Sequence, residues 1–180
     1  MGRLDRSGSY KSNFMEVSNM ATLTVLKFST PEGAQKMLAK VEALQKSQLI
    51  KVQDAAIVTW PQGKKAPKTK QAVNLAGLGA LDGAFWGMLF GLIFFVPFFG
   101  MAIGAAMGAL SGKMGDYGID DEFIKKTRDQ VTEGTSALFL LTSDAVVDKV
   151  VDELKGEQFE IIASNMTKEQ EDELRKAFAS

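Results

Sequence analysis

The sequence has no cysteine and no histidine among its 180 residues. The lack of cysteine excludes disulfides, thiol nucleophiles and thiolate metal sites, and it fits a reducing cytoplasm. The lack of histidine removes the commonest general base near neutral pH and the commonest metal ligand, so serine triads and histidine-based zinc sites lose their usual partner. No convergent set of carboxylates, lysines or hydroxyls is visible in their place. We therefore predict no enzymatic activity, no cofactor and no bound metal.

An excess of positive charge is also missing, because 21 Lys and Arg stand against 22 Asp and Glu, with a formal net charge of -1. Proteins that bind nucleic acid gain affinity by neutralising phosphates with clustered basic residues. We therefore do not expect a nucleic-acid partner. Residues 1–19 contain no apolar run of the kind that forms a signal-peptide core. They read as a disordered leader or N-terminal extension, and either Met1 or Met20 is the natural start.

Outside the apolar centre, the sequence pattern alternates between strands and helices. The expected elements run strand, helix, strand, then strand, helix, strand, helix, over residues 22–28, 31–46, 50–60, 137–142, 143–156, 159–163 and 167–178. Thr30 and Ser143 are expected N-caps. Gly156 is expected to end a helix, and Thr167 with Gln170 resembles a capping box. Two similar βαβ halves predict an α+β fold, a ferredoxin-like split βαβ sandwich whose helices cover one face of an antiparallel sheet.

The expected organisation is one domain interrupted by an insertion. Residues 20–70 form the first βαβ half with a basic loop, and residues 119–180 form the second half with a C-terminal helix. Between them, residues 71–118 form an inserted apolar glycine-zipper helical hairpin. A fold shared by many unrelated functions says little about activity, so this insertion is the informative part of the chain.

The insertion has no charged residue between Asp82 and Lys113. Glycines recur there at every fourth position, in two series: Gly79, Gly83, Gly87 and Gly91, then Gly100, Gly104, Gly108 and Gly112. A glycine inside a helix costs about 1 kcal/mol relative to alanine, so a favourable contact must offset the cost. A groove of glycines lets another helix backbone approach closely. The pattern predicts two helices that pack, and oligomerise, through their glycine faces.

Bulky apolar residues lie opposite the glycines. In the first arm we expect them to face lipid or another subunit: Phe85, Trp86, Leu89, Phe90, Ile93 and Phe94. Pro97 discourages helix at Val96, which places the hairpin tip at Phe95, Val96, Pro97, Phe98 and Phe99. A polar turn would be expected in water, so the apolar tip favours a membrane.

The length of the arms limits this interpretation. About fourteen uncharged residues span roughly 21 Å as a helix, whereas the hydrocarbon core of a bilayer is about 30 Å thick. A longer first arm would carry Asp82 into the span, where a carboxylate is costly. A shallow, re-entrant or tightly oligomeric hairpin is therefore as consistent with the sequence as a two-pass span.

Basic residues lie on both sides of the hairpin. Lys64, Lys65, Lys68 and Lys70 precede it and are candidates for contact with anionic headgroups, although a solvated loop explains them as well. Lys113, Lys125 and Lys126 follow the hairpin. Positive charge at both ends predicts that both remain in the cytoplasm. We expect a bacterial inner-membrane protein with its soluble domain facing the cytoplasm, and a cytoplasmic protein is the alternative.

Acidic clusters offer weaker hypotheses. Asp120, Asp121 and Glu122 are interpreted as helix capping rather than metal binding. Asp144, Asp148 and Asp152 are interpreted as a solvated helix face rather than paired catalytic acids.

A family resemblance rests on the run AGLGALDGAFWGMLFGLIFFVPFFGMAIGAAMGALSGKMGDYGIDDEFIK followed by EGTSALFLL. These segments resemble the DUF1269 family of bacterial and archaeal predicted membrane proteins. The resemblance extends from Met20 to Phe178. It implies a membrane association based on the apolar hairpin and implies no activity, so no catalytic residue is carried over from it.

Three functional hypotheses follow. The first is a non-enzymatic, membrane-associated homo-oligomer in which the zipper hairpins mediate insertion and self-assembly, as a scaffold, membrane-remodelling element or small pore. The second is a soluble homo-oligomeric ring, cage or filament whose hairpins bury one another. The third is a small-ligand sensor or enzyme that uses the ferredoxin-like sheet.

Overall fold

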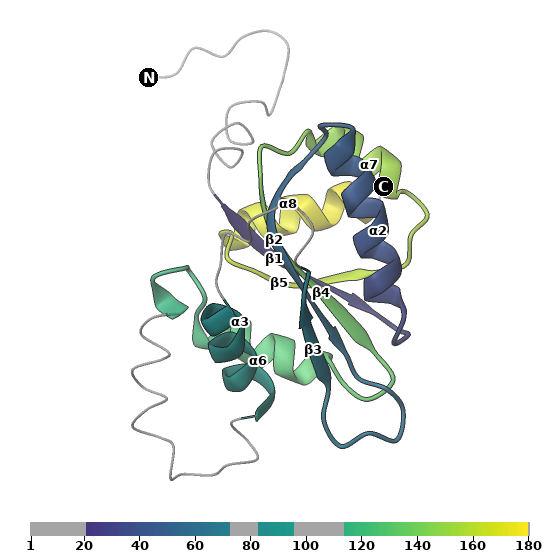
Figure 1. Ribbon diagram of the computed structural model, residues 1–180. Coiled ribbons are helices and arrows are strands. Elements are labelled where there is room, and N and C mark those ends of the chain that lie inside the picture. Colours follow the sequence, from purple (N-terminus) through teal and green to yellow (C-terminus); the bar gives the residue numbers. More distant parts are fainter. Residues whose placement is uncertain (1–20, 73–82, 96–113, 180) are drawn as a thin grey trace, which may run out of the picture.

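The computed structural model describes residues 21–72, 83–95 and 114–179 (Figure 1). Within these ranges the protein is a mixed α/β structure with a five-stranded antiparallel sheet. Its elements in chain order are β1 (Thr22–Phe28), α2 (Gly33–Lys46), β2 (Lys51–Thr59), β3 (Lys68–Gln71), α3 (Gly83–Phe90), the π-helix η1 (Gly91–Phe95), α6 (Asp121–Gln130), β4 (Ser136–Ser143), α7 (Val147–Leu154), β5 (Glu160–Ser164) and α8 (Lys168–Ala179).

The sheet interleaves the two βαβ units of the chain. Its strand order is β3-β2-β4-β1-β5, and every described neighbour pair is antiparallel. Strand β4 therefore lies between β1 and β2, which α2 connects, and β1 lies between β4 and β5, which α7 connects. Each βαβ unit is split by a strand of the other unit.

The central strands are buried on both faces. In β1, Val25 belongs to one core cluster and Leu26 to the other, because successive side chains point to opposite faces of a sheet. In β4, Phe139 faces the first cluster while Leu138 and Leu140 face the second. A sheet with two apolar faces requires a layer of helices on each.

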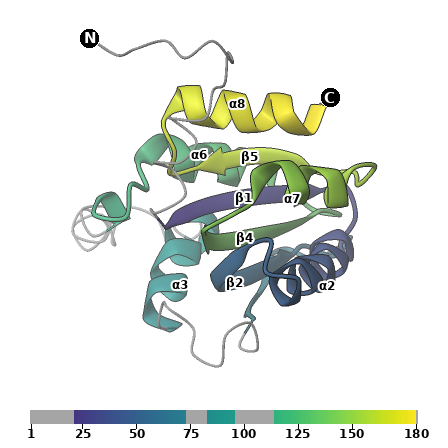
Figure 2. The same ribbon diagram turned by 90° about the horizontal axis from the view of Figure 1, so that it is seen from above.

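Helices cover both faces of the sheet. Helices α2 and α7 lie on one side, and α3 and α6 lie on the other (Figures 1 and 2). The expectation that helices cover one face only is therefore wrong. The physical reason is that part of the insertion packs on the domain itself, since the buried residues of α3 and η1 belong to the same core cluster as Val25 and Phe139.

Two expected N-caps are wrong. Helix α2 begins at Gly33 with Glu32 at its N-cap and no side-chain cap from Thr30. Instead, Ser136 at the start of β4 accepts a hydrogen bond from the Ala34 amide (3.0 Å) and donates one to the Thr30 carbonyl (2.7 Å). Helix α7 has Val146 at its N-cap, because Ser143 still belongs to β4.

Other helix boundaries are confirmed. Gly156 follows α7 with a φ of 89°, a left-handed conformation that glycine adopts without strain. At the start of α8, the Thr167 amide donates to Gln170 Oε1 (3.1 Å) and the Gln170 amide donates to Thr167 Oγ1 (3.4 Å). This reciprocal pair is the expected capping box.

Candidate functional site

The described part of the first glycine series lies on α3 and η1. Phe85, Trp86, Leu89 and Phe90 are buried, whereas Gly83 and Gly87 are exposed and Gly91 is half-buried. Residues four apart lie on one side of a helix, so the glycines form one outward-facing edge and the bulky residues form the opposite side. We call Gly83, Gly87 and Gly91 the glycine face.

The bulky side of α3 packs on the protein's own sheet. Phe90 contacts Phe139 of β4 edge-on at a centroid distance of 5.1 Å, and Trp86 contacts the same ring edge-on at 6.2 Å. Trp86 and Phe90 also stack on each other at 5.6 Å. The expectation that these residues face lipid or another subunit is therefore wrong. Burying such aromatic groups against the sheet stabilises the domain, which explains their position.

A buried carboxyl group fixes α3 to the sheet. Asp54 in β2 is 1% exposed, and its Oδ2 accepts a hydrogen bond from Trp86 Nε1 at 3.2 Å. The Ala55 amide donates to Asp54 Oδ1 at 2.8 Å, and Gln71 Nε2 in β3 donates to Oδ2 at 3.1 Å. Buried polar groups need such partners. One carboxyl group therefore joins two strands to α3, and no sequence signal singled it out except an acidic residue inside a buried strand.

No described atom covers the glycine face. A Cβ atom built on Gly83, Gly87 or Gly91 meets no atom within 4 Å in the described part of the chain. A helix edge without side chains lets a second backbone approach closely, and the resulting dispersion contacts offset the low helix propensity of glycine. The arrangement can therefore accept another helix.

The regular helix changes to a π-helix at Gly91. Five residues, Gly91–Phe95, form η1 instead of continuing α3. Arg128 of α6 donates through Nε to the Ile93 carbonyl (2.8 Å) and through Nη2 to the Leu92 carbonyl (2.6 Å). Carbonyls near a helix end lack partners within the helix, and a guanidinium fork can satisfy two of them at once. Arg128 thus ties η1 to α6.

The basic residues before α3 are exposed, but they are not all in a loop. Lys64 and Lys65 lie between β2 and β3, whereas Lys68 and Lys70 belong to β3, which the basic-loop interpretation missed. Strand β3 is an edge of the sheet and contacts α3. Lysines on an edge strand discourage pairing with another chain, and they also place positive charge beside α3.

The acidic clusters lie at the start of α6 and on or just before α7. Asp120 is the N-cap of α6 and accepts a hydrogen bond from the Phe123 amide at 2.8 Å, which confirms the capping interpretation. Asp144, Asp148 and Asp152 are exposed. Among residues 21–72, 83–95 and 114–179, no group of three acidic side chains has the geometry to hold a metal ion.

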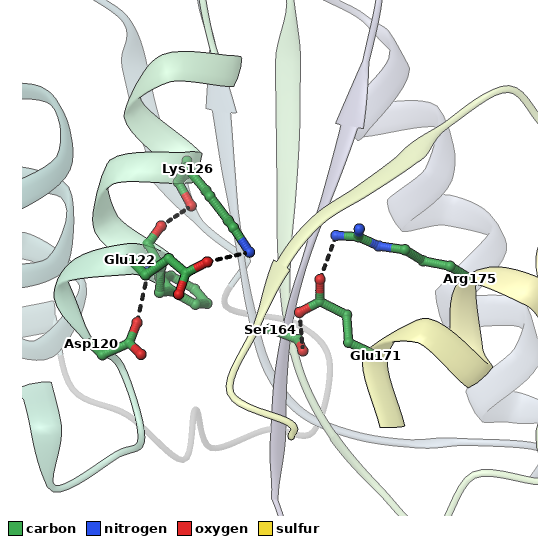
Figure 3. Close-up of polar contacts among 8 residues, drawn as sticks. Asp120, Glu122, Lys126, Ser164, Glu171 and Arg175 are labelled. Carbon is green, nitrogen blue, oxygen red and sulfur yellow. Dashed lines mark hydrogen bonds and ion pairs between the residues drawn. The ribbon is translucent and has the colours of Figure 1, made fainter. Parts of the chain in front are cut away.

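Two charged pairs, one on α6 and one on α8, lie near β5. On α6, Lys126 Nζ lies 2.9 Å from Glu122 Oε1, and on α8 Arg175 pairs with Glu171, which also accepts from the Ser164 hydroxyl (Figure 3). The hydrogen bond with Glu122 raises the pKa of Lys126, and the negative charge of Glu171 acts in the same direction. The Ser164–Glu171 hydrogen bond connects α8 to β5, whereas the Lys126–Glu122 pair is internal to α6.

Several predicted site residues lie outside the described residues. These are Gly79, Gly100, Gly104, Gly108, Gly112, Val96, Pro97, Phe98 and Phe99. Of the expected hairpin tip, only Phe95 is described, as the last residue of η1. Within the described ranges, no helix combines the length and the apolar character needed to cross a bilayer.

Comparison with known proteins finds one family. The family model described as "Protein of unknown function (DUF1269)" matches residues 80–179. The resemblance expected from Met20 onward is therefore supported from residue 80. Searches of curated proteins and of solved structures found no match.

Proposed function

The chain belongs to the DUF1269 family, whose function is unknown, and we propose that it is a non-enzymatic, membrane-associated protein that assembles with copies of itself. The observation that supports this proposal is that the two sides of α3 differ. Its bulky side is occupied by the sheet, while Gly83 and Gly87 on its other side are exposed, and a Cβ added to either would have no described atom within 4 Å. The glycine face is the surface left for a partner helix.

The partner we propose is the glycine-rich hairpin of the same or another copy. Residues 79–112 would then form a glycine-zipper hairpin, with the second glycine series lying outside the described residues. The rest of the chain would be a ferredoxin-like domain, a proposal supported by the strand order and by the two split βαβ units. In this arrangement the domain lies in the cytoplasm and supports an assembly of hairpins.

The lysines support the membrane part of the proposal. Lys64, Lys65, Lys68 and Lys70 are exposed, and β3, which carries the last two, contacts α3. A basic residue near an anionic membrane surface contributes about 1 kcal/mol. We propose that they contact lipid headgroups. Flotation with vesicles of phosphatidylglycerol or phosphatidylcholine tests this contact: the anionic vesicles should carry the protein upward, and Lys64→Glu with Lys65→Glu should reduce the effect. Equal flotation with both lipids would contradict it.

A substitution on the glycine face tests self-assembly. Gly87→Leu places a large side chain where the second backbone should lie, so the oligomer should become smaller. Gly115→Leu is the matched control, because Gly115 is also exposed, has no described atom within 4 Å of a built Cβ and lies outside the glycine face. Size-exclusion chromatography with light scattering, in mild detergent, measures both. An unchanged oligomer size for Gly87→Leu would contradict the proposal.

A soluble assembly is the second candidate, and one observation favours it. The bulky side of the first arm is buried in the domain's own core, so this side offers no large apolar surface to lipid. Fractionation of cells followed by an alkaline carbonate wash distinguishes the two candidates. Retention in the washed membrane supports the membrane assembly, whereas release as a detergent-independent oligomer supports a soluble ring, cage or filament.

A further inference from the structure

A second surface of the described chain carries an apolar cavity. It lies on the opposite side of the sheet from the glycine face, between β1, β4, β5, α2, α7 and α8, and its volume is about 140 Å³. Apolar atoms from Leu140, Val150, Leu154, Leu174 and Phe178 contribute to its wall, and it is partly open to solvent. An enclosed apolar cavity of about 150 Å³ can bind a molecule the size of benzene.

Helix α8 covers this cavity without filling it. None of the residues of α8 is buried, and its apolar side chains Leu174 and Phe178 are only half-buried although they pack against the core. Van der Waals contacts are lost where a cavity faces a side chain. An apolar guest would restore these contacts and complete the burial of the inner side of α8.

The polar residues in the wall indicate which polar group a bound molecule can carry. The uncharged polar residues that line the cavity are Thr22, Thr24, Thr142, Ser143 and Gln170, and the acidic ones are Asp144 and Glu173. No lysine or arginine of the described chain lines it. A guest with a carboxylate would meet two like charges, whereas a neutral hydroxyl can hydrogen-bond to the same groups.

We propose that this cavity binds a neutral, hydroxyl-bearing apolar molecule, with its alkyl or aryl part under α8 and its hydroxyl toward the threonines and carboxyl groups. The site is independent of self-assembly, because the sheet separates it from α3 (Figure 2). The proposal names a ligand class for the hypothesis that the sheet binds a small molecule.

Octanol and octanoate are matched probes, since they share a chain and differ in the charge of the head. Isothermal titration calorimetry of the full chain at neutral pH should give saturable binding of octanol at one site per chain. Octanoate should bind about tenfold more weakly or worse, because its carboxylate would be repelled by the negative charges of Asp144 and Glu173. Absence of saturable octanol binding, or equal affinity for octanoate, would overturn the proposal.

Substitutions locate the site. Val150→Phe fills the cavity and should weaken octanol binding about tenfold or more. Val146→Phe is the matched control, because Val146 lies one turn earlier on the same segment, is 48% exposed and does not line the cavity. If Val150→Phe does not fold by circular dichroism, Ala145→Phe provides the test at a half-buried position that lines the same cavity. Wild-type affinity in a folded cavity-filled variant would contradict the assignment.

Discussion

The indole Nε1 of Trp86 donates a hydrogen bond to Oδ2 of Asp54 across 3.2 Å, and this contact joins α3 to β2. Both residues are buried, at 3% and 1% exposed. The carboxyl group also accepts from the Ala55 amide and from Gln71. A polar group inside an otherwise apolar core specifies one docking position for α3, because a shifted helix would leave its donors and acceptors unpaired.

Asp54→Ala should destabilise the protein by about 1–3 kcal/mol, the usual cost of leaving buried donors unsatisfied. Urea unfolding followed by circular dichroism measures the free energy of unfolding, and hydrogen exchange should show loss of protection in α3. Asp148→Ala is the control, because Asp148 is exposed on α7, and it should change stability by less than about 0.5 kcal/mol. Equal stability of the two variants would show that Asp54 does not anchor the helix.

Arg128 is expected to hold η1 in its π-helical form. Arg128→Ala removes the donors to the Leu92 and Ile93 carbonyls, so it should cost about 1–3 kcal/mol. Arg128→Lys keeps the charge but loses the planar fork, and it should recover only part of the loss. Lys125→Ala is the control, since its pair with Asp129 is exposed and is worth about 0.5 kcal/mol or less. Hydrogen exchange that accelerates equally in η1 for both alanine variants would contradict this role.

The pH behaviour of Lys126 follows from its neighbours. Its pKa is raised above the ordinary lysine value, first by the hydrogen bond with Glu122. A pKa that is higher in the folded state means that the protonated amine stabilises the fold at neutral pH, and that this contribution is lost only as the pH rises through the folded-state pKa. Glu122→Gln should therefore lower the pKa of Lys126, as measured by NMR titration of its ε-methylene carbon.

Two further measurements make the Lys126 prediction specific. Glu153→Gln, an exposed position on α7, should leave the Lys126 pKa unchanged. At neutral pH, Glu122→Gln should change stability by about 0.5 kcal/mol or less, because exposed ion pairs contribute little. An unshifted Lys126 pKa in Glu122→Gln would mean that the hydrogen bond is not formed in solution.

The regular elements could be predicted from the sequence because each carries its own local signal. The strand at residues 22–28 is confirmed at both ends, and Thr167 with Gln170 forms the expected capping box. Strand β3 was missed, because its short sequence of lysines, threonine and glutamine lacks apolar alternation and forms a strand by pairing with β2.

The candidate site was predicted in part. The glycine periodicity predicts a helix with a small-residue edge, and the open glycine face on α3 agrees with that for Gly83 and Gly87. Periodicity could not predict which surface the bulky side of α3 contacts. A helix side that faces lipid and one that faces a protein core have the same apolar composition. The decisive signal was in the strands, whose inward and outward residues are both apolar and therefore need helices on both faces. The bond between Asp54 and Trp86 depends on tertiary proximity, which local spacing does not encode.

Substitution of Gly33 by alanine tests whether the start of α2 requires glycine. A Cβ atom at this position would overlap Phe28 Cβ and lie 2.7 Å from its Cγ, closer than van der Waals contact allows. Phe28 is 6% exposed and belongs to the core beneath α2, so its ring has little room to move. Gly33→Ala should therefore destabilise the protein by about 1–3 kcal/mol, as overpacking of a core does.

Gly115→Ala is the matched control for this substitution, because no described atom lies within 4 Å of its added Cβ. In a helical position alanine gains up to about 1 kcal/mol over glycine, so Gly115→Ala should leave the midpoint of urea unfolding unchanged or raise it. At Gly33 the same gain in helix propensity partly offsets the destabilisation caused by the clash. The measured loss of stability for Gly33→Ala is therefore a lower bound on the free-energy cost of the clash. If Gly33→Ala were as stable as Gly115→Ala, Phe28 would have to be free to turn away, and the close contact between β1 and α2 would not be required by the fold.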